Sequence, residues 1–299
     1  MNERHPHQHR RMLKWVNKAR EDGHKIWMQA ITTPNDMRFM LDDFNLFDGN
    51  GAWRDVTIGD IPTRIEKMNN PELRAAVRED YDNGSAPFVS GPIADIVIDS
   101  VANDENKNYV GMTIAELGID TGKHPADAML DLAISEGLKT VFYVTPFNWE
   151  ESYVNEVLQN EWTVPGVSDG GAHTKFLNFG RYPTSMLAEL VRERGSYTLE
   201  EAHYRLAALP AKAAGFDDRG TLEVGRAADV GRAADVVVYD YENLKLLPTK
   251  IVHDLPGDEW RYVETAEGYR YTIVNGEIIR VDNETTGAYP GKLLRHGYA

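Results

Sequence analysis

The stretch VPGVSDGGAHTKF, residues 164–176, decides the fold that this sequence predicts. It starts as an apolar run, typical of a buried strand, which stops just before Asp169. Functional sites in α/β folds are built at the carboxyl ends of parallel strands, so Asp169 is a candidate site carboxylate. Gly170 and Gly171 follow it and let a ligand or another backbone approach closely, and His173 comes soon after them.

Two roles for Asp169 are compatible with the residues alone. As a functional group, its carboxylate can bind a metal ion and carry a proton to and from a bound water. As a structural group, it can cap the turn or helix that follows. The spacing of the residues favours neither role over the other.

Helices and strands alternate along most of the chain, which predicts an α/β fold. Apolar residues recur at helical spacing from Met12 to Ala19, and Gly23 ends that helix. The expected helices are 10–22, two within 61–82 that break at Pro71, 111–122, 124–137, 148–159, 183–195, 198–206 and 210–215. The expected strands in this part are 25–32, 93–100, 139–145 and 162–168.

Two segments depart from this alternation. Residues 35–60 are rich in aromatic residues, Asp and Gly with weak periodicity, so we expect a long functional loop or lid there. After about residue 218 the chain shows short strands, TLEVG at 221–225 among them, with Gly and Asn-Gly turns, and Asn275 with Gly276 favours a type I′ hairpin. We therefore divide the chain into residues 1–217 and a β-rich flanking module, residues 218–299.

A perfect tandem repeat, GRAADV, occupies residues 225–230 and again residues 231–236. One copy is enough to turn at its glycine and lead into the strand that follows. We expect the second copy to be a duplication without function that bulges into solvent.

The composition excludes several classes of protein. With 42% hydrophobic and 26% charged residues among 299, the chain is that of a folded protein. A net charge of -15 argues against nucleic acid or an anionic membrane as partner and favours a small-molecule substrate. Without cysteine, a metal site needs His, Asp, Glu or a modified Lys. The first residues contain no secretory signal and no apolar run reaches membrane-spanning length, so we expect a cytoplasmic location.

Several motifs together resemble the C-terminal half of the amidohydrolase superfamily, in the branch of the N-acyl-D-amino-acid deacylases, or D-aminoacylases. The upstream segments 9–34 and 125–144 resemble this branch too, so the resemblance covers nearly the whole chain. The motifs that carry it are SDGGAH at 168–173, LEEA at 199–202, PAKAAGF at 210–216 and, with one repeat removed, DRGTLEVGRAADVVVYD from residue 218.

The resemblance implies a metal-dependent hydrolase of non-peptide C–N bonds on a (β/α)8 barrel with a β-sandwich flank. In such an enzyme a bound metal, expected to be Zn²⁺, activates water to attack the amide of a small N-acyl amino acid. Asp169 would be a metal ligand and the catalytic proton carrier. Residues near the substrate would be Gly170, Gly171, His173 and Arg181, the last within the GRYP turn.

The sequence departs from the family pattern in its metal ligands. The family uses a His-x-His pair after its first barrel strand and further histidines after later strands. The HPHQH run here, with His5, His7 and His9, leads into a helix instead, so we expect a solvated tail or helix lead-in there. None of the remaining histidines outside the SDGGAH motif follows a predicted strand; they are His24, His124, His203, His253 and His296.

We therefore expect a partial barrel in residues 1–217. Strands 25–32 and 162–168 would be barrel strands 7 and 8, separated by a long insertion at about 35–160, and strands 1 to 6 would lie outside this chain. We expect the chain alone neither to hold zinc nor to hydrolyse amides, and to be poorly soluble, oligomeric or partly unfolded. Three functions stay open: a portion of a deacylase, a non-catalytic fragment or pseudoenzyme, or one half of a split enzyme whose other half is a separate chain.

Overall fold

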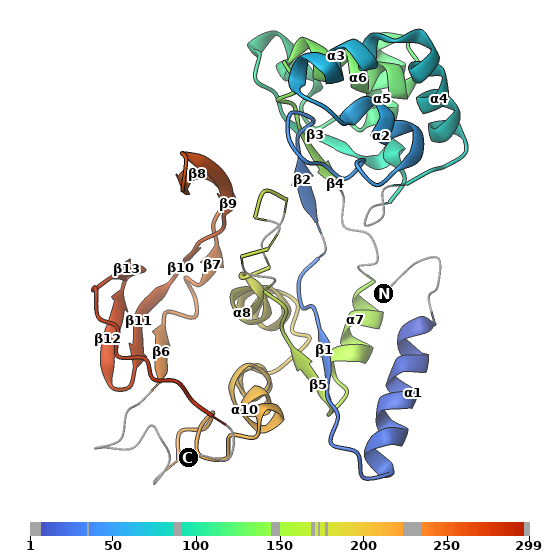
Figure 1. Ribbon diagram of the computed structural model, residues 1–299. Helices are drawn as coiled ribbons and strands as arrows, with labels where there is room; N and C mark the ends of the chain where they lie inside the picture. The colour runs from blue at the N-terminus through green and yellow to red at the C-terminus, as the bar shows by residue number, and fades with distance from the viewer. Residues whose placement is uncertain are drawn as a thin grey trace. The chain divides into compact units, whose positions relative to one another are not determined.

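A computed structural model describes residues 7–34, 36–86, 91–144, 150–168, 171–172, 174–176, 179–223 and 235–295 (Figure 1). The chain forms two compact units. The first unit, as we call it, contains residues 1–33, 149–174 and 178–299. The inserted unit contains residues 34–148 and also the short segment 175–177. A second discontinuous piece thus enters the inserted unit from the loop that follows the candidate carboxylate.

Two short parallel strands lie in the first unit. Strand β1 (Met28–Ala30) pairs with β5 (Thr163–Pro165), with Met28 opposite Thr163. Helix α1 (Gln8–Glu21) precedes β1, and α7 (Glu151–Leu158) precedes β5. Both strands are shorter than the sequence predicts, but their helix–strand order is the predicted one. The mixed α/β class is confirmed, while the partial barrel and the β-sandwich stay predictions.

An arginine fixes the start of both strands. The Arg20 guanidinium lies 3.7 Å from the ring centroid of Trp162 and 5.1 Å from that of Trp27. Trp27 precedes β1 and Trp162 precedes β5, and their rings meet edge to face at 5.6 Å. Because a cation is attracted to the faces of both rings, this cluster favours the parallel register of β1 and β5.

Helices follow the site region in the first unit. Thr198 and Glu201 form a reciprocal capping box at the start of the second helical stretch, which explains why LEEA begins a helix. That stretch is continuous from Leu199 to Ala214, with a π-helical segment between two α-helical ones. The predicted break between residues 206 and 210 is therefore wrong. The segments are α8 (Tyr182–Ser185), the π-helix η3 (Met186–Glu193), α9 (Leu199–His203), the π-helix η4 (Tyr204–Ala208) and α10 (Leu209–Ala214).

The C-terminal segment is β-rich, as predicted. Its largest sheet is antiparallel with the order β13-β12-β11-β6. Asn275 and Gly276 have φ angles of 48° and 77°, which confirms the predicted Asn-Gly hairpin between β11 and β12. The strands are β6 (Val236–Tyr239), β7 (Lys245–Leu246), β8 (Lys250–Leu255), β9 (Glu259–Val263), β10 (Ala266–Glu267), β11 (Tyr269–Val274), β12 (Glu277–Val281) and β13 (Glu284–Thr285).

One expectation for this segment is wrong, and another is not tested. Residues 221–223 are not in a strand, so the strand expected at TLEVG is not formed there. The GRAADV repeat lies outside the described residues except for Asp235 and Val236.

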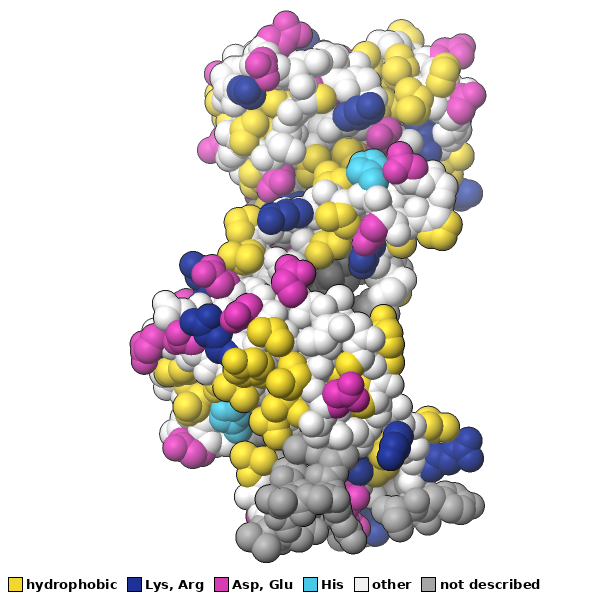
Figure 2. Space-filling view, turned by 90° about the vertical axis from the view of Figure 1, so that its left-hand side faces the viewer, with side chains coloured by type: hydrophobic (Ala, Val, Ile, Leu, Met, Phe, Trp, Pro, Cys, Tyr) yellow, Lys and Arg dark blue, Asp and Glu magenta, His cyan; other side chains and the backbone are white. Residues whose placement is uncertain are grey.

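Figure 2 shows hydrophobic side chains exposed on the face of the first unit that carries this β-rich segment. Exposed apolar residues of the large sheet are Val237, Val238, Tyr271 and Ile278.

The inserted unit has its own hydrophobic core around a three-stranded antiparallel sheet, β2-β4-β3. The strands are β2 (Met37–Phe39), β3 (Val97–Ser100) and β4 (Val141–Val144). The α-helices are α2 (Gly51–Thr57), α3 (Ile61–Asn69), α4 (Pro71–Asp82), α5 (Ile114–Thr121) and α6 (Pro125–Ser135). The 3₁₀ helices are η1 (Ile93–Asp95) and η2 (Asp104–Tyr109). Asn70 caps α4 directly before Pro71, which explains the predicted break.

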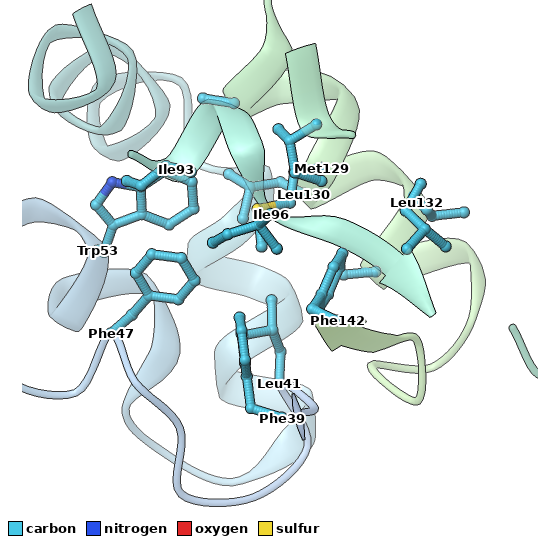
Figure 3. Close-up of a cluster of buried hydrophobic side chains, with 14 of the residues drawn as sticks. Phe39, Leu41, Phe47, Trp53, Ile93, Ile96, Met129, Leu130, Leu132 and Phe142 are labelled. Carbon is cyan, nitrogen blue, oxygen red and sulfur yellow. The ribbon is translucent and has the colours of Figure 1, made fainter. Parts of the chain in front are cut away.

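The expectation of a long loop or lid at residues 35–60 is wrong in part: residues 40–50 have no helix or strand, but their flanks do. Strand β2 and helix α2 form there, and Phe39, Phe47 and Trp53 are fully buried against Phe142 and Met129 (Figure 3). The Phe47 and Trp53 rings stack with centroids 4.4 Å apart. These elements are too short to show a clear period in the sequence, and their aromatic residues serve the core instead of a binding pocket.

Burial of a tyrosine predicts a loss of stability at alkaline pH. Tyr197 is 5% exposed, and burial raises its pKa from the ordinary value of 10.0 to about 12. The unfolded chain releases this phenolic proton at lower pH than the folded chain. The free energy of unfolding should therefore fall as the pH rises from 10 towards 12, and Tyr197→Phe should remove that part of the fall.

Urea unfolding across this pH range measures the effect. Tyr204→Phe, at an exposed position of the same unit, is the matched control. An equal change of slope in the two variants would contradict the prediction.

Close packing of α5 on α6 predicts that Gly118 cannot be enlarged. A Cβ on Gly118 would lie 2.9 Å from the Cα of Pro125 and 2.8 Å from its Cγ. We expect Gly118→Ala to lower the free energy of unfolding by about 1–3 kcal/mol, measured by urea denaturation. The control is Gly51→Ala in α2 of the same unit, where nothing lies within 4 Å, and it should be neutral or stabilising.

Candidate functional site

The candidate site is the loop between β5 and α8, residues 166–181, which we call the site loop. Asp169, Gly170 and His173 lie outside the described residues, so their roles stay predictions. Gly171 and Arg181 are described. The geometry of the site is therefore that of the described parts of the loop and of the residues that hold them.

Both ends of the site loop lie at the carboxyl ends of β1 and β5. Gly166 follows β5, has a φ of 134° and donates its N–H to the Ala30 carbonyl at 2.9 Å. A Cβ on Gly166 would come within 3.4 Å of the Tyr182 ring, so only glycine suits this position without strain. The Thr32 hydroxyl donates to the Tyr182 carbonyl at 3.4 Å. The loop therefore leaves and returns at the strand edge where α/β sites are built.

The hairpin β8–β9 holds the middle of the site loop. The backbone N–H of Tyr262, in β9, donates to the carbonyl of Thr174 at 2.8 Å. Nearer the strand, the N–H of Phe179 donates to the carbonyl of Ser168 at 3.3 Å. These bonds fix the backbone on both sides of the predicted site residues.

The next residues of the loop belong to the inserted unit. The carbonyl of Phe176 accepts a hydrogen bond from the N–H of Arg38 in β2 at 2.9 Å, and the Phe176 ring is buried 5.2 Å from that of Phe44. Lys175 pairs with Asp43. Partial burial alone would raise the pKa of the Asp43 carboxyl. Hydrogen bonds from Lys175 and from the Phe44 amide, together with the charges of Lys175 and Arg64, outweigh burial and leave this pKa below its usual value.

Arg181 has a buried ionic partner in the β-rich segment. Its Nη1 lies 2.9 Å from Oε1 of Glu264, which follows β9, and the two side chains are 16% and 9% exposed. The Thr249 hydroxyl donates to the same Oε1 at 3.2 Å. Neither Glu264 nor Thr249 is predictable from the sequence, because nothing near Glu264 signals a partner 83 residues away.

The described residues do not by themselves form a metal site. No group of three or more His, Asp or Glu among them is placed to hold an ion. Most of the described histidines have other contacts instead. His9 lies buried in α1, which fits the expected helix lead-in and not a solvated tail, with Nε2 3.0 Å from Glu156. The contacts of His124, His203 and His253 are with Asp82, Tyr239 and the Asp258 carbonyl. His7 lies beside Arg10, and His24 is exposed.

The attachment of the site loop to the inserted unit gives a prediction. Phe176→Ala should lower the free energy of unfolding of that unit by about 3–5 kcal/mol, because a buried ring leaves a cavity. It should also speed hydrogen exchange at the Arg38 amide, whose acceptor is the Phe176 carbonyl. Urea unfolding and amide exchange measure the two effects.

The matched control is Phe44→Ala, which removes the 61% exposed partner ring. It should leave the Arg38 amide protected. Equal exchange in both variants would contradict the prediction.

Comparison with known proteins places this geometry in a family context. The model of the amidohydrolase family matches residues 7–280. Over 152 residues the chain is 32% identical to the N-acyl-D-glutamate deacylase of Alcaligenes xylosoxydans xylosoxydans, which is 50% of this chain and 28% of that protein. It is also 30% identical to an uncharacterized protein of Mycobacterium tuberculosis over 216 residues. This alignment covers 69% of this chain and 34% of that protein. The chain thus spans about a third of these relatives' length.

Two solved structures are also similar. One is the N-acyl-D-glutamate deacylase of Bordetella bronchiseptica, complexed with zinc and a phosphonate inhibitor, at 21% identity and a TM-score of 0.44. That match covers 90% of this chain and 43% of that chain. The other is a D-aminoacylase, at 20% identity and a TM-score of 0.39, with 73% of this chain and 44% of that chain covered.

Proposed function

The chain belongs to the amidohydrolase family, and from this premise we propose that it forms part of a metal-dependent hydrolase that cleaves the amide bond of N-acyl-D-amino acids. The observation that carries the proposal is the family match over residues 7–280. The 32% identity to an N-acyl-D-glutamate deacylase supports the substrate class. Cleavage would release a carboxylate and a D-amino acid from a non-peptide C–N bond.

We propose that β1 and β5 are neighbouring strands of a partial (β/α)8 barrel, within residues 1–217 and interrupted between them by residues 34–148 of the inserted unit. Their parallel pairing, each behind a helix, supports this. Residues 218–299 would be the flanking β module. Placing the site loop after β5 then puts Asp169 where a barrel enzyme carries its catalytic groups.

Asp169 is the proposed catalytic carboxylate. At the end of β5 it would take a proton from the attacking water and return it to the leaving amine. The proposed cofactor is Zn²⁺, with Asp169 as one ligand, but the described residues do not complete a zinc site. The remaining ligands are therefore assigned to residues outside this described set, and no step is derived through the metal.

Arg181 is the proposed anchor for the substrate carboxylate, with Gly170, Gly171 and His173 beside the scissile amide. A guanidinium presents several N–H donors in a plane that matches a carboxylate. Arg181 adjoins Tyr182, whose ring packs on Gly166 just after β5. Arg181 therefore lies near the carboxyl end of β5, where the reaction is proposed to occur. The net charge of -15 supports a small molecule and not nucleic acid as partner, and the proposed location is the cytoplasm.

One half of a split enzyme is the second candidate function. The observation that favours it is the sheet β1-β5, which has only two strands among the described residues. Two parallel strands bury too little backbone to be stable alone, so further strands from another segment, another chain or self-association would complete the sheet.

The described part of the chain contains no helix with the length and hydropathy to cross a bilayer.

Hydrolysis of enantiomeric substrates tests the proposal. The chain should be assayed with Zn²⁺ for release of D- and L-glutamate from their N-acetyl derivatives. It is assayed alone and after mixing with the part of the A. xylosoxydans deacylase that precedes its match. We expect D-selective hydrolysis, and Asp169→Asn should lower kcat/KM by about 10²–10⁴-fold.

The control is Asp120→Asn, at an exposed position in α5, which should hydrolyse like the native chain. Activity in the mixture only would support the split enzyme. Hydrolysis in neither preparation, or equal rates for both enantiomers, would show that the proposed function is wrong.

A further inference from the structure

We propose that Glu264 positions the guanidinium of Arg181, so that the β-rich segment supplies a specificity-determining residue to the substrate site. The inference rests on the proposed function in one respect, that Arg181 meets the substrate carboxylate. Glu264 would then set both the direction of that guanidinium and the charge that the substrate encounters there.

The base of the hairpin β8–β9 fixes the Glu264 carboxylate. Lys250 pairs with Val263 at the open end of the hairpin, so Thr249 and Glu264 are the next residues on the two strands. The Thr249 hydroxyl donates to Oε1 of Glu264 at 3.2 Å, and the same oxygen accepts from Nη1 of Arg181 at 2.9 Å. Glu264 is therefore held from its own hairpin while it contacts the site loop.

A second attachment fixes the hairpin relative to the loop. The Tyr262 N–H donates to the carbonyl of Thr174, and the Tyr262 side chain is buried. Tyr262 and Glu264 are two residues apart on one segment, and their partners, Thr174 and Arg181, both lie on the site loop before its return to Tyr182. Two contacts from one hairpin resist rotation of the loop better than either contact alone.

Burial makes this pair sensitive to its charge. Both side chains are largely removed from water. In such a site ionic interactions are strong and an unpaired charge is unfavourable. Removing the Glu264 side chain would leave the guanidinium without this acceptor and change the direction in which it is held. Replacing the carboxylate with an amide keeps an acceptor oxygen and removes only the negative charge that repels an anionic substrate.

The two substitutions at Glu264 should therefore have opposite effects. Glu264→Ala should weaken binding of N-acetyl-D-glutamate by about 10-fold or more, through loss of orientation. Glu264→Gln should bind it at least as tightly as the native chain, through loss of like-charge repulsion. Neither should change binding of the matching α-carboxamide, which lacks that charge. Calorimetry on the full chain measures all three.

The matched control is Asp254→Ala. Asp254 makes a two-bond ion pair with Arg261 in the same hairpin, at 2.7 Å for each bond, without contact to Arg181. It should leave both affinities unchanged. Equal weakening by Asp254→Ala and Glu264→Ala would mean that general loosening of the hairpin explains the result, which would overturn the proposal.

A second measurement needs no ligand. The Nη–H signals of Arg181 in a ¹⁵N spectrum, assigned by their loss in Arg181→Lys, should be distinct and slow to exchange in the native chain and in Glu264→Gln, because Nη1 is the atom that contacts residue 264. In Glu264→Ala they should join the exposed arginine signals. An unchanged signal in Glu264→Ala, or a native chain that binds no N-acetyl-D-glutamate, would overturn the inference.

The outcomes separate the inference from the proposed function. Binding that follows this pattern without hydrolysis would sustain the inference and contradict the deacylase. Hydrolysis that is D-selective, with Glu264→Ala unchanged in KM and kcat, would sustain the deacylase and contradict the inference.

Discussion

The parallel pairing of β1 and β5 is the constraint on which the candidate site depends. Parallel neighbours cannot be joined by a tight hairpin, so a long crossover must connect them. Here that crossover contains an entire inserted unit with its own sheet and core. Because both strands run in the same direction, the inserted unit and the site loop both begin at the carboxyl ends of the strands. The cluster of Arg20, Trp27 and Trp162 lies at the opposite end of the two strands, away from the candidate site.

Elements with a local physical signature were predictable from the sequence. Helix α1 has apolar residues on one face, Pro71 and its Asn70 cap separate α3 from α4, and Asn275 with Gly276 forms the expected turn. The elements that were missed have no such signature. Strand β2 and helix α2 are short and buried on several sides, so their aromatic residues show no period. Pro210 lies at the start of α10 in a continuous stretch, where its missing N–H is tolerated by the change of register.

The candidate site was predictable only where a motif carried it. SDGGAH drew attention to the loop after β5, and Arg181 followed from the same resemblance. Glu264 and Thr249 could not be found this way, since an ion pair across 83 residues leaves no local pattern. The attachment of Phe176 to β2 was equally invisible, because one aromatic residue in a loop looks the same whether it is exposed or buried in another unit's core.

The discontinuity of the inserted unit limits how this protein can be recombined with its relatives. An exchange of residues 34–148 alone would transplant a core that lacks the ring of Phe176 and a sheet edge that lacks its carbonyl. The chimera would meet a foreign tripeptide at 175–177, which must fill the same space and accept the same hydrogen bond. A working graft therefore has to carry both pieces.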